Sequence, residues 1–235
     1  AMYRGLVGSE MCIRDRLGAK AVNNLTGLEL IPAMILLGGL SLAYSLYGGL
    51  KAVALTDVIQ VVLLIFGGLF VTYKGLDLLS EGNGLFEGFM ILQSEFPEKF
   101  DAILSYAPKE VDPEAYANYI KLPGIWVLIG GMWIAHFYYW GTNQYITQRA
   151  LGGKSLDEAQ NGLMFAGFLK IFMPIVVVLP GLIAVALEAN GTINLAGDRS
   201  NAYPSMLNLL PEGIKGLTFA ALVAAIVSSL ASLSN

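Results

Sequence analysis

Five long apolar stretches constrain this chain more than any other feature of its sequence. They run from about residue 31 to 50, 52 to 73, 122 to 145, 161 to 186, and 214 to the end. Each approaches the roughly 20 residues that an α-helix needs to cross a bilayer core of about 30 Å. Because an open strand cannot satisfy its backbone polar groups in lipid, all five are expected to be helices. The sequence therefore predicts an all-α polytopic membrane protein with about five transmembrane helices.

The composition agrees with a membrane location and excludes other classes. Apolar residues make up 55% of the chain and charged residues 14%, whereas soluble domains carry roughly a quarter charged residues. The formal net charge is -4, and Lys and Arg do not cluster beyond the extreme N-terminus, so no nucleic-acid partner is expected. The single cysteine, Cys12, allows neither an internal disulfide nor a cysteine-based metal site.

The two ends of the sequence differ from what lies between them. Residues 1–16, AMYRGLVGSEMCIRDR, are polar and basic, and they resemble translated sequencing-adapter sequence. A non-native leader is therefore expected there, with a loop outside the membrane as the alternative; the segment lacks the apolar run of a secretory signal. The sequence stops inside an apolar run, at residues 232–235. We expect residues 17–235 to be part of a larger helical bundle.

Loop charges predict the orientation of the helices. Lys51 lies in the short connection between the first two stretches, and Arg149 and Lys154 lie in the short connection before the fourth. The positive-inside rule places both connections in the cytoplasm. Gly48 and Gly49 are expected to make the first of these connections a tight turn, because glycine adopts turn conformations without strain from a Cβ atom.

The remaining two connections are then outside. The segment from about 75 to 121 is long and acidic, and long loops cross membranes whatever their charge. We expect it to be an extracellular loop with short surface helices at about 86–93 and 100–106.

Lys170 and Pro174 mark a polar point within the fourth stretch. An ammonium group inside a membrane costs on the order of 2.5–3.5 kcal/mol, so Lys170 should face the bundle interior. Pro174 lacks the N–H that would bond the Lys170 carbonyl, which leaves a cation and a hydrogen-bond acceptor together. This pair suits a solute-binding cavity. The alternative is a lysine that reaches the membrane surface or pairs with a carboxylate such as Asp57.

The third stretch contains His136, Tyr139 and Trp140, whose i, i+3, i+4 spacing places them on one helix face. Sugars stack their C–H patches on aromatic rings and exchange hydrogen bonds through their hydroxyls, so this face suits a hydroxylated ligand. An aromatic belt at the membrane interface is the alternative reading of Tyr139 and Trp140. The alternative reading of His136 is a polar residue of the helix core whose hydrogen bonds are satisfied by its neighbours.

The fifth stretch places Ala225, Ser228 and Ser229 at the same i, i+3, i+4 spacing. One carbonyl and two hydroxyl oxygens on one face suit Na⁺, if another helix supplies further ligands. Close helix packing by small residues is the alternative. Asp57 lies near the start of the second stretch, where either a functional role or stabilisation by the helix dipole explains a carboxylate.

Three long segments resemble the sodium/solute symporter family, and closely its bacterial sodium/galactose branch. They are SLYGGLKAVALTDVIQVVLLIFGG, LPGIWVLIGGMWIAHFYYWGTNQYITQRAL and GIKGLTFAALVAAIVSSLASL, and the resemblance covers residues 27–235. It implies a multi-pass protein of the inner membrane with a LeuT-like fold, in which two inverted five-helix repeats enclose a midplane site. The first two helices here would close the first repeat, and the last three would open the second.

The resemblance also implies roles for individual residues. Tyr139, with Trp140 beside it, matches a tyrosine that stacks on the sugar as an inner gate, and Lys170 matches a lysine that bonds sugar hydroxyls. Residues Ala225, Ser228 and Ser229 match sodium ligands, and Asp57 matches an acidic residue linked to sodium coupling. His136 stands where the galactose transporter has a sugar-binding asparagine, so selectivity toward glucose or another hexose is expected. The remaining sugar contacts and sodium ligands would lie on helices outside this chain.

The expected function is thus sodium-coupled import of a hexose by alternating access. A symporter of myo-inositol, an amino acid or a carboxylate is the alternative, as is a sensor with a symporter-like input domain. A serine hydrolase built from Ser228 or Ser229 with His136 is not expected, because no G-x-S-x-G elbow surrounds the serines. No enzymatic activity is predicted.

Overall fold

The computed structural model describes residues 2–101, 103–104, 106, 108–122 and 124–234. These residues form helices and connecting segments, and none of those described lies in a strand. The chain divides into two compact units, residues 1–92 with 166–235, and residues 93–165.

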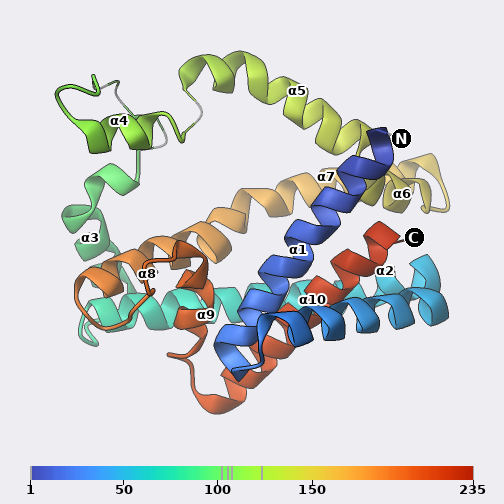
Figure 1. Cartoon of the computed structure of the whole chain (residues 1–235), viewed down its shortest axis with the longest axis horizontal. Coiled ribbons are helices and arrows are strands. Elements are labelled where there is room, and N and C mark those ends of the chain that lie inside the picture. The colour runs from blue at the N-terminus through green and yellow to red at the C-terminus, as the bar shows by residue number, and fades with distance from the viewer. Residues whose placement is uncertain (1, 102, 105, 107, 123, 235) are drawn as a thin grey trace. The chain divides into compact units, whose positions relative to one another are not determined.

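The first unit contains most of the long helices (Figure 1). Its elements, including two helices that continue into the second unit, are α1 (Met2–Thr26), α2 (Leu30–Leu79), α3 (Leu85–Glu95), α7 (Leu156–Met173), a π-helical turn (Pro174–Val178), α8 (Leu179–Ala189), a 3₁₀ turn (Arg199–Asn201), α9 (Ala202–Leu207) and α10 (Glu212–Ser234). Residues 2–16, which composition sets apart, are helical and continuous with the rest of α1.

The second unit is made of shorter elements. These are a 3₁₀ turn (Pro97–Lys99), α4 (Pro113–Tyr119), a π-helical turn (Val127–Gly131), α5 (Met132–Phe137), a second π-helical turn (Tyr138–Thr142) and α6 (Gln144–Leu151). Asp112 begins α4 by accepting a hydrogen bond from the backbone N–H of Ala115 at 2.9 Å, and Pro113 occupies the first helical position.

A turn at Gly49 divides α2 into two helices. Gly49 has φ 59° and ψ -179°, a conformation that a Cβ atom would strain. The two halves are long and apolar enough to span a membrane, at Leu30–Gly49 and Val53–Leu79. In Figure 1 the second half runs back beside the first. The predicted tight turn is confirmed, although the second half ends at Leu79 rather than near residue 73.

Four of the five predicted spans are long apolar helices among the described residues: the two halves of α2, the segment Leu156–Ala189, and Glu212–Ser232. The third predicted stretch, 122–145, is also helical but alternates between π and α turns from Val127 to Thr142. Each π turn inserts an extra residue into the helix, and glycines at 130, 131 and 141 weaken α-helical continuity. By helix length and composition, the described residues thus contain four candidate membrane spans.

Two short helices were predicted in the acidic loop, and the structure agrees with one of them. The expected helix at 86–93 is confirmed as α3. The expected helix at 100–106 is wrong, since none of the described residues in that range is helical. The segment leads into Pro108, and residues before a proline disfavour the α conformation. Tyr106 instead contacts the rings of Tyr116 and Tyr119 of α4, with centroids 6.3 and 5.4 Å away.

Glycines in α2 let neighbouring helices approach closely. A Cβ atom at Gly67 would lie 2.6 Å from Cγ2 of Thr218 on α10. A Cβ atom at Gly68 would meet the side chain of Val176 and lie 3.0 Å from its carbonyl oxygen. Lipid supplies no hydrophobic force between helices, so such close packing is a main source of their association. The second half of α2 is therefore fixed between α10 and the π turn that begins at Pro174.

The loop before α9 is joined to α1 by polar contacts. Lys20 donates hydrogen bonds to Asp198 and, at 2.6 Å, to the hydroxyl of Ser200. One turn later, Asn24 donates to the side chain of Asn201 at 2.8 Å. The hydrogen bond from Lys20, followed by those from Ser200, lowers the pKa of Asp198 well below its usual range. The loop charges predict that this contact lies outside the cell.

The close approach at Gly68 predicts a steric effect on stability. Gly68→Ala should destabilise the protein by about 1–3 kcal/mol, because the new methyl group would press on the side chain and the carbonyl oxygen of Val176. Gly39→Ala is the control, since a Cβ atom there meets nothing within 4 Å. Thermal unfolding in detergent measures both. Equal melting temperatures for the two variants would show that the contact does not constrain the packing.

The contact between Lys20 and Asp198 predicts local protection of the loop. Asp198→Asn should speed amide hydrogen exchange at residues 198–203 by about two- to fivefold, because exposed ion pairs contribute little. Because the pKa of Asp198 is lowered, the stabilisation that its carboxylate gives to the loop is complete above the ordinary carboxyl pKa and is lost only in acid. The difference in exchange rate between Asp198→Asn and the unmodified protein should therefore stay constant between about pH 5 and 8. Asp101→Asn, which changes another exposed carboxylate, should leave amide exchange at residues 198–203 unchanged.

Candidate functional site

The contact between Asp57 and Ser228 joins two spanning helices inside the first unit. Asp57 lies in the second turn of the second half of α2, and Ser228 lies in the middle of α10. The Ser228 hydroxyl donates a hydrogen bond to Oδ1 of Asp57. Ser228 is only 2% exposed, and Oδ2 of Asp57 is also shielded from solvent. The structure thus places the predicted coupling residue against one of the predicted sodium ligands.

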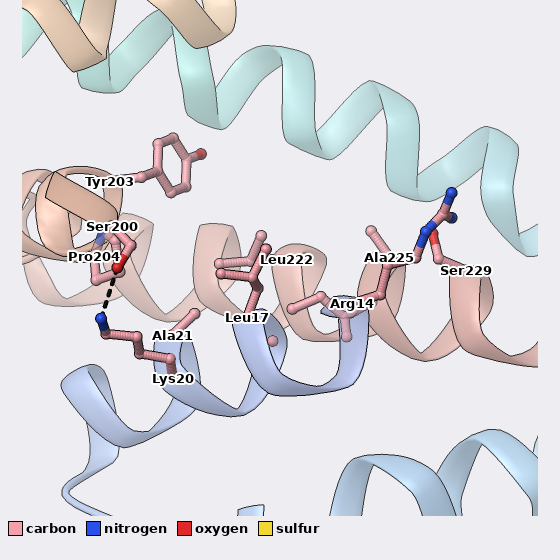
Figure 2. A pocket seen from close by; sticks show the side chains of 12 residues that line it. Arg14, Leu17, Lys20, Ala21, Ser200, Tyr203, Pro204, Leu222, Ala225 and Ser229 are labelled. Atoms are coloured by element: carbon pink, nitrogen blue, oxygen red, sulfur yellow. Dashed lines mark hydrogen bonds between the residues drawn. The ribbon is translucent and has the colours of Figure 1, made fainter. Parts of the chain in front are cut away.

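The other two sodium candidates lie on the same part of α10. Ala225 and Ser229 are half-buried and line a cavity of about 460 Å³ between α1, α9 and α10. In Figure 2 both residues face the space beside α1. Ser228 contacts Asp57, whereas Ala225 and Ser229 line the cavity, so the three candidates lie within about one turn of α10 but do not share the single face that their spacing predicted. Oxygen ligands of this kind suit Na⁺.

Two cations also border this cavity. Arg14 extends from α1 toward Ser229 (Figure 2), and Lys20 reaches the loop before α9, where it bonds Asp198 and Ser200. A guanidinium group beside Ser229 repels a sodium ion there. The Arg14 guanidinium therefore disfavours Na⁺ on the side of α10 that carries Ser229, whereas Ser228 lies on the side that contacts Asp57.

Lys170 lies on α7, and its side chain is exposed within the described part of the chain. At Pro174 the helix passes into a π turn, Pro174–Val178, and continues as α8. Thr72 of α2 lies within hydrogen-bond distance of two carbonyl oxygens, 3.1 Å from that of Ile175 and 2.9 Å from that of Gly68. A hydroxyl from the neighbouring helix therefore helps to satisfy the backbone around the π turn.

His136, Tyr139 and Trp140 lie in the second unit. His136 is exposed at the end of α5, and the other two are half-buried in the π turn that follows. The rings of Tyr139 and Trp140 contact each other edge to face, with centroids 5.4 Å apart and planes at 86°. The pair forms an aromatic corner of the kind on which a sugar ring stacks. Lys170 belongs to the other compact unit.

Among the described residues, no group of three His, Cys, Asp or Glu side chains lies together as a metal site. The oxygen that contacts the Asp57 carboxylate is the neutral hydroxyl of Ser228, and a single carboxylate beside neutral oxygens suits a monovalent cation better than a divalent one.

Sequence reasoning missed a contact between two hydroxyl residues near Asp57. Tyr44 and Thr56 are hydrogen-bonded across the Gly49 turn, and Thr56 precedes Asp57 directly. The signal was present, because a tyrosine and a threonine flank the two glycines of a predicted hairpin. Their pairing depends on how the two halves of α2 face each other, which helical periodicity within each half does not give.

Comparison with known proteins identifies the family. Residues 11–235 match the model of the sodium:solute symporter family. The chain is 43% identical to the sodium/glucose cotransporter of Vibrio parahaemolyticus over 93% of this chain and 41% of that protein. It is 32% identical to human sodium/myo-inositol cotransporter 2, over 93% of this chain and 34% of that protein. With sheep sodium/glucose cotransporter 1 the identity is 27%, again over 93% of this chain and 35% of the relative.

The chain thus spans about two fifths of the length of the bacterial relative and about a third of the animal ones. The match confirms the predicted resemblance, the all-α multi-pass membrane class, and Na⁺ as the co-transported ion of the family. It also confirms that these are cotransporters and not enzymes. The chain belongs to the sodium:solute symporter family.

Proposed function

We propose that the protein to which this chain belongs imports a hexose together with Na⁺ by alternating access. The contact between Asp57 and Ser228 supports this proposal most directly. A carboxylate is costly within a membrane span and is normally retained there for function. Here it meets a serine of α10 that lies within about one helical turn of the other sodium candidates.

Na⁺ is cargo in this scheme, held by the carbonyl oxygen of Ala225 and the hydroxyls of Ser228 and Ser229, with Asp57 beside them. A cation bound near Ser228 competes with the proton of that hydroxyl for Oδ1 of Asp57 and stabilises the carboxylate charge. Binding therefore changes the contact between α2 and α10. Coupling arises if Na⁺ binds the outward-open state more tightly than the inward-open state, since a ligand shifts an equilibrium only by its difference in affinity.

The driving force comes from the membrane potential and the sodium gradient. Each charge that crosses contributes about 2.3 kcal/mol per 100 mV, to which the sodium concentration ratio adds. Inward transport driven this way fits an inner, energised membrane, and we place the protein there.

The proposed solute is a neutral sugar bound by His136, Tyr139, Trp140 and Lys170. The edge-to-face pair of Tyr139 and Trp140 supplies a stacking surface, and His136 and Lys170 supply hydrogen bonds to hydroxyl groups. The relatives include cotransporters for glucose and for myo-inositol, both polyhydroxylated rings. His136 is proposed to set the preference among hexoses, because it stands where the galactose branch of the family has asparagine.

Myo-inositol transport is the second candidate. It is favoured by the 32% identity to the human myo-inositol cotransporter. The same aromatic and hydrogen-bonding groups would serve a cyclitol, so a direct transport assay is needed to distinguish the two.

The first test is solute uptake by the full-length protein in proteoliposomes. Labelled glucose, galactose and myo-inositol are supplied under an inward Na⁺ or K⁺ gradient, with a His136→Asn variant in parallel. We expect uptake of a hexose only with Na⁺, and a shift toward galactose in the variant. Sodium-driven uptake of myo-inositol alone would replace the hexose assignment, and no sodium-dependent uptake of any of the three would reject the proposed solute class.

A second test concerns the sodium site. Ser228→Ala removes a sodium ligand and the hydrogen bond to Asp57, so it should raise the half-saturating Na⁺ concentration about tenfold, as expected for a hydrogen bond to a charged group. Ser205→Ala, a serine of α9 outside the site, is the matched control. An unchanged sodium dependence in Ser228→Ala would remove Ser228 from the site.

A further inference from the structure

Two hydroxyl groups meet across the turn that divides α2. Tyr44 lies near the end of the first half and Thr56 near the start of the second, and their side-chain oxygens are hydrogen-bonded. Both residues are half-buried. This bond joins the two halves of α2 through side chains. Thr56 directly precedes Asp57, whose carboxylate contacts α10.

The direction of the bond follows from the second contact of Thr56. The Thr56 hydroxyl donates to the carbonyl oxygen of Val53 at 3.0 Å, within the first turn of the second half. Its single proton is therefore used, and its oxygen is left to accept. The phenolic O–H of Tyr44 is thus the donor, and Thr56 relays the connection from Tyr44 to the backbone of Val53.

This relay acts on the residue that follows it. Asp57 is adjacent to Thr56, and its carboxylate accepts the hydrogen bond from Ser228 of α10. Helix rotation about the Gly49 turn would move Asp57 around the axis of the second half and away from Ser228. Gly49, with its positive φ, permits such rotation more readily than any other residue type. A bond from Tyr44 to Thr56 opposes it.

We propose that Tyr44 is a positioning residue of the sodium site, which acts through Thr56 to hold Asp57 against Ser228. The inference rests on the proposed sodium-coupled function and adds a residue that touches neither the ion nor the solute. It specifies that loss of the Tyr44 hydroxyl weakens sodium binding while leaving the sugar site intact.

The sequence offers a matched control three residues away. Tyr47 lies on the same helix, and its side chain is 94% exposed. Tyr44→Phe and Tyr47→Phe make the same chemical change, the loss of one phenolic hydroxyl, but only the first removes the bond to Thr56. Thr56→Val removes the acceptor, and Thr56→Ser restores it.

The test is sodium-dependent sugar uptake by these variants of the full-length protein. Tyr44→Phe and Thr56→Val should each raise the half-saturating Na⁺ concentration about fivefold, the effect of one hydrogen bond, with the maximal rate unchanged. Tyr47→Phe and Thr56→Ser should match the unmodified protein. In a Ser228→Ala background, Tyr44→Phe should add little, because residues that act through one contact are not additive.

Two results would overturn the inference. One is an identical sodium dependence in Tyr44→Phe and Tyr47→Phe. The other is a fall in maximal rate with unchanged sodium dependence, which would indicate a purely structural role. A second readout distinguishes failure of the positioning role of Tyr44 from failure of the symporter proposal. Amide exchange at residues 53–57 should be faster in Tyr44→Phe than in Tyr47→Phe even if the parent protein transports none of the tested sugars. Equal exchange would reject the positioning role by itself.

Discussion

The packing of α10 against both halves of α2 is the constraint on which the candidate sodium site depends. Helices in lipid gain little from burying apolar surface against each other, so they associate where small residues allow backbones to approach. Gly67 provides such a point against Thr218, and the buried residues Leu37 and Leu230 belong to one apolar cluster with Ala33. Between these contacts α10 is held closely enough for Ser228 to reach Asp57.

Polar groups in the spans are satisfied by neighbours from other helices. Thr72 serves the carbonyl of Ile175 in the π turn, and Ser228 serves the carboxylate of Asp57. In both cases the partner is a hydroxyl, which donates or accepts at little desolvation cost compared with a charge. Hydroxyl groups are also the ligands that a dehydrated sodium ion needs, so the groups that stabilise the bundle are of the same chemical kind as those that bind the cargo.

The sequence predicted those features of the spans that depend on local pattern. Hydropathy located the four long apolar helices found among the described residues, and paired glycines located the turn at Gly49. Periodicity failed where the helix changed its own period, in the π turns from Val127 to Thr142. It also gave no sign of Tyr44 and Thr56, because a contact across a turn depends on the relative rotation of two helices and not on the pattern within either.

The shortness of the turn at Gly49 has a consequence for how the protein is made. Only residues 50–52 separate the spans Leu30–Gly49 and Val53–Leu79, too few to form a loop of their own. Two spans so joined should leave the translocation machinery and enter the bilayer as one helical hairpin. The Tyr44–Thr56 bond can then form within the hairpin during biosynthesis, before α10 has been translated. Asp57 would thus enter lipid next to a residue already paired, and Ser228 would complete its environment when the later helix arrives.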